Sequence, residues 1–308
     1  MIIALTGATG FLGRRLIPAL LAQGHEVRAL TRREPREHPA GLTWVPGDLQ
    51  SPQALAELAR GTQTVIHAAA SLRGTKHAHF DMPNRLGTAA VIEAANQAGV
   101  ERFIHVSSLA ARAPGLSHYA TSKHAAEALV MGESGLNWTV LRPPAVYGPG
   151  DTATLPFFKS VARGIAPRIG GGERPFSMIH VDDLISAIIF LLNAPSAQQL
   201  LVEIDDGREN GYTLPQLFGL IGNALDKKPV PLVIPVPALW LGAHASRLWS
   251  GVTGSAPMFT PEKLRELTAP DWVVKGTHLS AVSDWRPAIS GPEGIAATAA
   301  WYKGQGWL

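Results

Sequence analysis

Short runs of apolar, mostly β-branched residues alternate with longer helical patterns through the first half of the chain. The runs predict strands at 2–6, 26–31, 42–45, 64–67, 103–107 and 138–141. Apolar positions at helical spacing predict helices at 14–23, 54–59, 85–97 and 118–131. Strands separated by crossover helices predict a parallel, doubly wound sheet, so we expect an α/β fold of the Rossmann type.

The pattern changes after residue 147, where glycine and proline become frequent. A strand at 178–181, a helix at 182–192 and a strand at 200–204 are still predicted, followed by helices near 214–225, 261–267 and 294–303. We expect residues 1–148 and about 176–206 to form the main domain. Residues 149–175 and 207–308 are expected to form a smaller C-terminal lobe that binds the substrate.

One segment, residues 229–246, carries no Asp, Glu, Lys or Arg. Its length is close to the ~18 residues that a membrane-spanning helix needs. Pro229, Pro231, Pro235 and Pro237 interrupt its first half, and each removes a backbone donor. The pattern therefore favours a buried or pocket-lining segment, with a peripheral membrane face as the alternative, and no transmembrane segment is expected.

Composition narrows the range of functions. Of the 308 residues, 46% are hydrophobic and 17% are charged, which is typical of a folded globular chain. The 27 Lys and Arg exceed the 24 Asp and Glu by only three, so no nucleic-acid partner is expected. The absence of cysteine excludes disulfides, a thiol nucleophile and Cys-ligated metals. With no signal-peptide pattern after Met1, we expect a cytoplasmic protein. No metal site is expected either, because the pair His77 and His79 lacks a third ligand.

The first candidate site is a glycine-rich turn between the first strand and the first helix. It reads Thr6-Gly7-Ala8-Thr9-Gly10-Phe11-Leu12-Gly13, a G-x-x-G-x-x-G spacing. Glycines permit a tight turn and a close approach of the backbone to a pyrophosphate, and the helix N-terminus offers N–H groups to that anion. The motif predicts dinucleotide binding through Gly7, Thr9, Gly10, Phe11 and Leu12.

The end of the second predicted strand bears on which dinucleotide is bound. An acidic residue there would accept from the adenosine 2′-hydroxyl, but the chain reads Thr31-Arg32-Arg33 with no carboxylate before Glu34. A guanidinium at this position can bind a 2′-phosphate bidentately. Arg32 therefore favours NADP(H), and NAD(H) remains the alternative.

A third candidate is the pair Tyr119 and Lys123 in the predicted helix 118–131. Residues four apart lie on one helical face, so the phenol and the ammonium project together, and a nearby cation favours the phenolate. The preceding predicted strand ends in Ser107 and Ser108, at the sheet edge where doubly wound folds bind ligands. The hydroxyls and the Tyr–Lys pair therefore indicate acid–base chemistry at that edge.

In order and spacing, these motifs resemble the short-chain dehydrogenase/reductase superfamily, and more closely its extended branch, the NAD-dependent epimerase/dehydratase family. The resemblance runs nearly from end to end. It rests on the glycine motif at 7–13, Gly47-Asp48-Leu49, Ala68-Ala69-Ala70, Asn84 with Gly87-Thr88, Val106-Ser107-Ser108, Tyr119 with Lys123, the segments 141–151 and 179–184, and the tail from Asp284 to Leu308.

The resemblance implies roles for individual residues. Tyr119 would be the general acid/base, Lys123 would hold the nicotinamide ribose, and Ser108 would bind the substrate oxygen, with Ser107 as the fallback. Arg32 corresponds to the 2′-phosphate arginine of NADPH-using relatives. The remaining implied cofactor contacts are Asp48 and Leu49 at the adenine, Ala68, Ala69, Ala70 and Ser107, and Pro143 and Val146 at the nicotinamide.

The main hypothesis is an oxidoreductase that transfers hydride between NADP(H) and a carbonyl or secondary alcohol of a small-molecule substrate. Leu109 and Ala110 after Ser108 replace the acid/base pair of the sugar-nucleotide dehydratases, so dehydration is not expected. An epimerase that retains NAD+ and a non-catalytic dinucleotide-binding sensor or accessory subunit remain alternatives. The resemblance also implies a homodimer through helices 85–97 and 118–131, although their alanines equally fit packing against the chain's own sheet.

Overall fold

The computed structural model describes residues 1–33, 35, 37–133, 135–170, 172–194, 199–253 and 260–308. The chain divides into two compact units. The first comprises Met1–Arg142, Ile185–Glu203 and Thr277–Trp285, and the second comprises Pro143–Leu184, Ile204–Gly276 and Arg286–Leu308. Compared with the domains expected from sequence, 143–148, 176–184 and 204–206 fall in the second unit, and 277–285 falls in the first.

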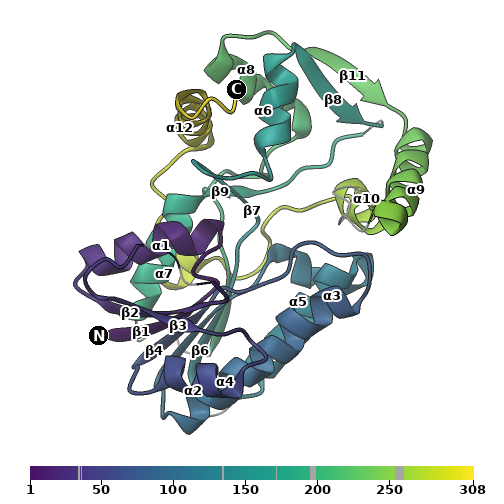
Figure 1. Cartoon of the computed structure of the whole chain (residues 1–308). Coiled ribbons are helices and arrows are strands. Elements are labelled where there is room, and N and C mark those ends of the chain that lie inside the picture. Colours follow the sequence, from purple (N-terminus) through teal and green to yellow (C-terminus); the bar gives the residue numbers. More distant parts are fainter. Residues whose placement is uncertain (34, 36, 134, 171, 195–198, 254–259) are drawn as a thin grey trace. The chain divides into compact units, whose positions relative to one another are not determined.

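A seven-stranded, entirely parallel sheet forms the centre of the first unit (Figure 1). Its spatial order is β10 (Leu200–Glu203), β6 (Asn137–Arg142), β5 (Arg102–Val106), β4 (Thr64–His67), β1 (Ile2–Thr6), β2 (Glu26–Thr31) and β3 (Leu42–Pro46). The order reverses direction at β1, as in a Rossmann-type doubly wound sheet, so the predicted fold class is confirmed.

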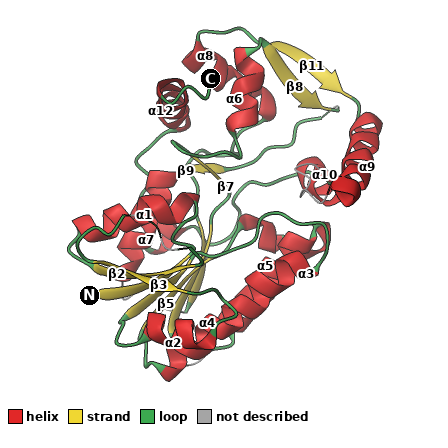
Figure 2. Ribbon diagram, in the orientation of Figure 1, coloured by secondary structure: helices red, strands yellow, loops and turns green. Residues whose placement is uncertain are grey.

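Helices cover the sheet of the first unit (Figure 2). They are α1 (Phe11–Ala22), α2 (Pro52–Ala59), α4 (Gly87–Gln97), α5 (His118–Met131) and the later part of α7 (Val181–Leu192). The unit also contains the short helices α3 (Ala78–Asp81), which contacts α5, and α11 (Leu279–Val282). A buried cluster joins α2, α4 and α5 to the sheet through residues such as Leu55, Val91, Phe103 and Val130. Apolar strands covered in this way are buried throughout, as β4 and β5 are.

The predicted strands and helices of the first unit are confirmed, and their ends differ by a few residues. The helix predicted at 85–97 is preceded by a π-helical turn, Met82–Leu86, before α4 begins at Gly87. Pro83 lies in this turn and lacks an N–H, which is consistent with irregular helix geometry there. Two short 3-10 turns, Leu109–Arg112 and Pro114–Leu116, connect β5 to α5.

The second unit packs helices around two small parallel sheets. The sheets pair β7 (Ala145–Tyr147) with β9 (Met178–His180) and β8 (Ile165–Ile169) with β11 (Val230–Ile234). The helices are α6 (Leu155–Ala162), α8 (Leu214–Leu225), α9 (Val236–Thr253), α10 (Pro261–Thr268) and α12 (Gly291–Gly304). Phe158, Phe218 and Tyr302 anchor a core that α6, α8 and α12 share. The sequence did not predict α6, β7, β8, β11 or α9.

The expectation that residues 229–246 are buried is wrong. Val230, Leu232 and Val233 of β11 are 69%, 51% and 57% exposed, and Leu241 of α9 is 74% exposed. The prolines do not prevent a strand, because β11 is an edge strand that pairs with β8 only. An edge strand needs partners on one side alone, which explains both the strand and its exposure. Among the described residues, no helix combines the length and apolar composition needed to cross a bilayer.

Candidate active site

The glycine turn joins β1 to α1 at the carboxyl edge of the sheet. Gly7 has φ +75°, and a Cβ at this position would lie 2.6 Å from the backbone carbon of Ala68. A Cβ on Gly13 would collide with the Gly7 carbonyl oxygen. The turn therefore needs glycine at two positions. Gly7 permits the positive φ and the close approach to Ala68, and Gly13 permits α1 to pack against the turn.

The start of α1 fits the phosphates of a dinucleotide. Gly10 is the N-cap, so no side chain caps the helix, and the first turn carries no acidic residue. Thr9 and Gly10 are exposed, and Phe11 and Leu12 are half-buried. The N–H groups of this turn are thus accessible to an anion, and the helix dipole favours negative charge there. The predicted contacts Gly7, Thr9, Gly10, Phe11 and Leu12 lie together on this turn.

The ends of β2 and β3 supply the residues predicted at the adenosine. Arg32 and Arg33 are exposed directly after β2, beyond the buried Thr31. Asp48 follows β3, and its Oδ1 accepts from the Gln50 N–H and the Ser51 hydroxyl, both at 2.9 Å. Asp48 therefore also shapes its own loop. The neighbouring Leu49 packs so closely against α4 that a Cβ on Gly87 would lie 2.7 Å from its Cδ1.

The loop after β4 carries Ala68, Ala69 and Ala70. The Ala69 N–H donates to the Thr6 hydroxyl at 3.2 Å, which ties this loop to the glycine turn. Farther along, Asn84 is 1% exposed, accepts from the Ser71 N–H at 2.6 Å and donates to the Ser122 hydroxyl at 2.9 Å. Asn84 thus links the loop after β4 to α5.

The helix α5 carries the predicted tyrosine and lysine. The Ser117 hydroxyl caps it by accepting from the Ala120 N–H at 3.0 Å. Tyr119 lies in the first turn and is half-buried, with its ring 6.3 Å from that of Phe80. Lys123, one turn later, is 1% exposed, and its Nζ donates to the Val106 carbonyl at 2.9 Å. The lysine is therefore anchored to the end of β5.

Two buried histidines, His105 and His67, lie close to Lys123. The Nζ of Lys123 lies 3.3 Å from Nε2 of His105, whose ring stacks on His67 at 5.3 Å. Burial lowers the pKa of Lys123 to about 8, against the raising effect of Glu127. Burial, with the charge of Lys123 second, lowers the pKa of His67 to about 3 and that of His105 well below its usual value. Both histidines are therefore neutral, and Lys123 is the charged group at neutral pH.

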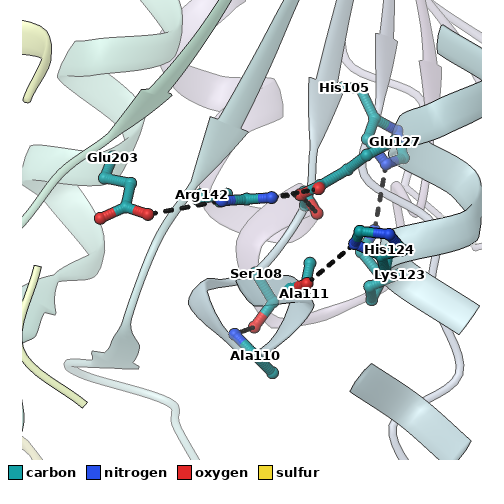
Figure 3. A network of polar contacts seen from close by, with 10 residues as sticks. His105, Ser108, Ala110, Ala111, Lys123, His124, Glu127, Arg142 and Glu203 are labelled. Atoms are coloured by element: carbon teal, nitrogen blue, oxygen red, sulfur yellow. Dashed lines mark hydrogen bonds and ion pairs between the residues drawn. The ribbon is translucent and has the colours of Figure 1, made fainter. Parts of the chain in front are cut away.

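The two serines after β5 have different environments, and Figure 3 shows Ser108 together with Ala110. The Ser107 hydroxyl donates to Oε1 of Glu127 at 2.5 Å, and Ser107 is 6% exposed. The Ser108 hydroxyl accepts from the Ala110 N–H at 3.2 Å and caps the short turn that follows. Ser107 is thus held inward by α5, whereas Ser108 is half-buried beside the turn that leads to Tyr119.

The sequence reasoning missed a buried ion network behind these serines. Glu127 is fully buried and accepts from Arg142 Nε at 2.8 Å and from its Nη2 at 2.6 Å. Arg142 Nη1 lies 3.5 Å from a carboxylate oxygen of Glu203, which is 1% exposed. The network links α5 to the ends of β6 and β10. The signal was present, because Glu127 follows Tyr119 and Lys123 at intervals of four on the buried face of one helix.

The chain's predicted nicotinamide-lining residues belong to the second unit. Pro143 is buried, and Val146 is half-buried in β7, opposite Ile179 of β9. Their contact with a cofactor stays a prediction. In the part of the chain that the structure describes, no three His, Asp or Glu side chains gather as ligands for a metal.

Known proteins are similar to this chain in sequence. Residues 3–202 match the sequence model of the NAD dependent epimerase/dehydratase family. A ceramide reductase from Caulobacter vibrioides is 37% identical, and the alignment covers 100% of this chain and 96% of that protein. A 4-hydroxy-2-methyl-3-oxo-4-farnesyl-3,4-dihydroquinoline-1-oxide ketoreductase from Stigmatella aurantiaca is 35% identical, over 60% of this chain and 62% of that one.

Solved structures of other proteins have a similar fold. The UDP-glucose 4-epimerase of Thermotoga maritima superposes with a TM-score of 0.78 over 99% of both chains, at 20% identity. The family match spans most of the chain, and the Caulobacter relative is similar along its whole length. This chain is therefore an NAD(P)-dependent oxidoreductase or epimerase and belongs to the NAD dependent epimerase/dehydratase family, the extended branch of the short-chain dehydrogenases/reductases.

Proposed function

We propose that the protein is a reductase that uses NADPH to convert a ketone on a lipid-like substrate into a secondary alcohol. The observation that carries the proposal is the face of α5 at the end of β5. There Tyr119 is half-buried, the ammonium of Lys123 is fixed one turn away, and Ser108 lies next to the turn that leads to the tyrosine.

The chain's own residues provide the acid–base part of this reaction. NADPH, when bound, would supply the hydride for the carbonyl carbon. The Ser108 hydroxyl donates a hydrogen bond to the carbonyl oxygen and orients it, and the Tyr119 hydroxyl gives its proton to that oxygen as charge develops. The nearby ammonium of Lys123 stabilises the phenolate that remains. The phenol regains its proton from solvent before the next turnover.

The relatives favour an apolar substrate. Their names denote reductases of a ceramide and of a farnesyl-bearing oxo compound, and both compounds carry long hydrocarbon groups. In this chain, Leu109 and Ala110 follow Ser108 where a dehydratase needs acid/base groups. A hydride transfer that needs only one proton donor therefore fits this site better than an elimination.

Arg32 supports NADPH as the cofactor. Its guanidinium is exposed at the end of β2, the position from which a 2′-phosphate is bound in this fold. Along with Arg32, the proposed cofactor contacts are Gly7, Thr9, Gly10, Phe11, Leu12, Asp48, Leu49, Ala68, Ala69, Ala70, Ser107, Tyr119, Lys123, Pro143 and Val146.

The experiment starts with the purified protein, which is denatured so that any released nucleotide can be identified by mass spectrometry. An empty protein is then tested for thermal stabilisation by NADPH and NADH, and for NADPH oxidation with a ketone on a long acyl chain and with a short-chain analogue. We expect selective stabilisation by NADPH and turnover of the long-chain ketone. Stoichiometric bound NAD+ would instead support the epimerase with a retained cofactor. No response to either dinucleotide would contradict the proposal.

Two further properties belong to the same proposal. We propose a homodimer, because α4 and α5 are the helices through which the resembled family pairs, and Met131 at the end of α5 is 40% exposed. We also propose the cytoplasm as the compartment, because a chain without cysteine fits a reducing environment. Light scattering of the purified protein and fractionation of the source cells test these two statements.

A further inference from the structure

The second unit exposes an unusually apolar strand at the edge of its small sheet. Val230, Leu232 and Val233 of β11 are each more than half exposed, and Ile165, opposite Val230 on β8, is 38% exposed. Leu241, which is 74% exposed, belongs to α9, the helix that follows β11 in the chain. Figure 1 labels both elements. We call Ile165, Val230, Leu232, Val233 and Leu241 the apolar ribbon. Val230, Leu232 and Ile165 lie on one face of this two-stranded sheet and Val233 lies on the other, so apolar side chains flank the outer edge of β11 on both faces. Exposed apolar side chains that gather along an edge in this way mark binding surfaces.

Another β-strand is a poor partner for the apolar ribbon. The Val230 N–H donates to the Gly164 carbonyl, and the Ile234 carbonyl accepts from the Gly170 N–H. Residues 230, 232 and 234 therefore direct their backbone groups toward β8, and residues 229, 231, 233 and 235 direct theirs outward. Three of these four are proline, so the outer edge keeps only the Val233 N–H as a donor for pairing with a second copy. A partner that binds the exposed side chains must therefore do so without forming β-sheet hydrogen bonds to the outer edge of β11.

The surroundings of the apolar ribbon are cationic. Lys227 and Lys228 are exposed directly before β11, and Arg168 is exposed on β8 opposite Val233. Asp226, which is exposed, precedes these lysines, and between Asp226 and Glu262 the sequence contains no Asp or Glu. The half-buried Trp240 stacks on His244 in α9, and tryptophan is the side chain that most favours the boundary between water and hydrocarbon.

A hollow beside the apolar ribbon is lined by further positively charged side chains. It has a volume of about 410 Å³ and shares Ile165 with the ribbon. Its lining includes Lys159 and Arg163 and no carboxylate. A hollow with two cations next to exposed aliphatic side chains matches a phosphate headgroup next to its acyl chains.

We propose that the apolar ribbon and its cationic surroundings form a docking surface for an anionic lipid bilayer, on which the protein binds peripherally. Val230, Leu232 and Val233 enter the boundary between headgroups and acyl chains, while Lys227, Lys228, Lys159 and Arg163 bind lipid phosphates. The surface is independent of catalysis, because docking needs neither cofactor nor turnover.

Vesicle flotation of the full chain tests the proposal. We expect binding to phosphatidylcholine vesicles that contain phosphatidylglycerol, and weaker binding to phosphatidylcholine alone or at high salt. Val233→Glu should weaken binding at least about tenfold, since it replaces an inserted apolar side chain with a charge. The matched control, Val282→Glu, makes the same change at a 37% exposed valine of the first unit and should bind like wild type.

A second pair of variants tests the charges. Lys227→Gln with Lys228→Gln should weaken binding to anionic vesicles by about fivefold for each charge. Arg60→Gln with Lys303→Gln removes two exposed charges elsewhere and should have no effect. If Val233→Glu fails to fold by circular dichroism, this pair decides the test alone.

Three outcomes would overturn the proposal. They are a wild type that floats with neither vesicle, a Val233→Glu protein that folds and floats like wild type, and a dimer in solution that Val233→Glu dissociates without any vesicle binding. The last would assign the apolar ribbon to a second copy of this chain. A Tyr119→Phe protein should bind vesicles like wild type, so a failure of the proposed reaction and a failure of docking are distinguishable.

Discussion

The Ser107 hydroxyl donates a 2.5 Å hydrogen bond to the carboxylate of Glu127, two helical turns beyond Tyr119. The same carboxylate accepts two hydrogen bonds from Arg142. Glu127 thus fixes the end of β5 to the face of α5 that carries Tyr119 and Lys123. We regard Glu127 as a positioning residue for the proposed reaction.

Replacing Glu127 by Gln tests this role. The amide keeps the shape but removes the charge that Arg142 faces, so we expect a loss of about 3 kcal/mol or more in unfolding free energy, the range for a broken buried pair. Urea unfolding measures it. Glu133→Gln near the end of the same helix, where the carboxylate accepts from an exposed Asn96, should change stability by less than about 1 kcal/mol. Equal effects of the two changes would contradict the positioning role.

Tyr119→Phe removes the proposed proton donor and keeps the ring that lies against Phe80. We expect kcat to fall about 10²- to 10⁴-fold, the usual contribution of a positioned general acid. The dissociation constant for the dinucleotide should change little. Single-turnover kinetics and fluorescence titration measure the two quantities. Activity near the wild-type level would exclude Tyr119 as the acid.

The parts of this site that lie within one helix or one turn could be predicted from the sequence, and the parts that join separate elements could not. Tyr119, Lys123 and the glycine turn are local patterns, in which spacing along one helix or one turn fixes the geometry. Glu127, Arg142 and Glu203 come from one helix and two strands, and only the register of β6 with β10 brings the last two together. The spacing of four residues along α5 indicates Glu127, but no spacing in the sequence indicates that Arg142 and Glu203 join it.

The second unit shows the same limit more strongly. Its strands β7, β8, β9 and β11 are three to five residues long and pair across large separations in sequence. Residues 229–246 were misread because a run without charges suggests burial, whereas burial depends on which element covers the strand. The prolines of this segment indicate an edge strand, because proline cannot donate a hydrogen bond to a neighbouring strand.

Gly7 and Gly24 form a matched pair for testing the glycine turn. Both have φ +75°, but a Cβ on Gly7 would meet the Ala68 backbone at 2.6 Å, and nothing lies within 4 Å of one on Gly24. Gly24→Ala should cost about 1 kcal/mol of stability through the backbone angle alone. Gly7→Ala should cost more and should abolish thermal stabilisation by NADPH. Equal losses in the two variants would show that the close approach to Ala68 has no role.

Arg32→Asp tests the choice of dinucleotide. A carboxylate at the end of β2 repels a 2′-phosphate and accepts from a 2′-hydroxyl, so the ratio of kcat/KM for NADPH to that for NADH should fall by about 10²-fold or more. Arg60→Asp, an exposed arginine at the end of α2, is the control for a general change in charge and should leave the ratio unchanged. A ratio that Arg32→Asp does not move would refute the 2′-phosphate role.

The pKa of Lys123 predicts how activity depends on pH. Burial lowers this pKa from 10.5 to about 8, so the ammonium that stabilises the phenolate of Tyr119 is lost as pH rises through about 8. We expect kcat/KM to fall on the alkaline side with an apparent pKa near 8. Glu127 raises the pKa of Lys123, so Glu127→Gln should move this limb to lower pH, which a merely structural role would not do.

Stability should change with pH in the opposite direction. The folded protein holds Lys123 at a lowered pKa, so between about pH 8 and 10.5 the unfolded chain binds more protons and the free energy of unfolding rises with pH. Compared with Lys123→Met, which has no charge to bury, the wild type should gain up to about 3 kcal/mol across this range. Urea unfolding of both proteins at several pH values measures the gain. A constant difference between them would mean that Lys123 does not titrate there, and the alkaline loss of activity would then need another group.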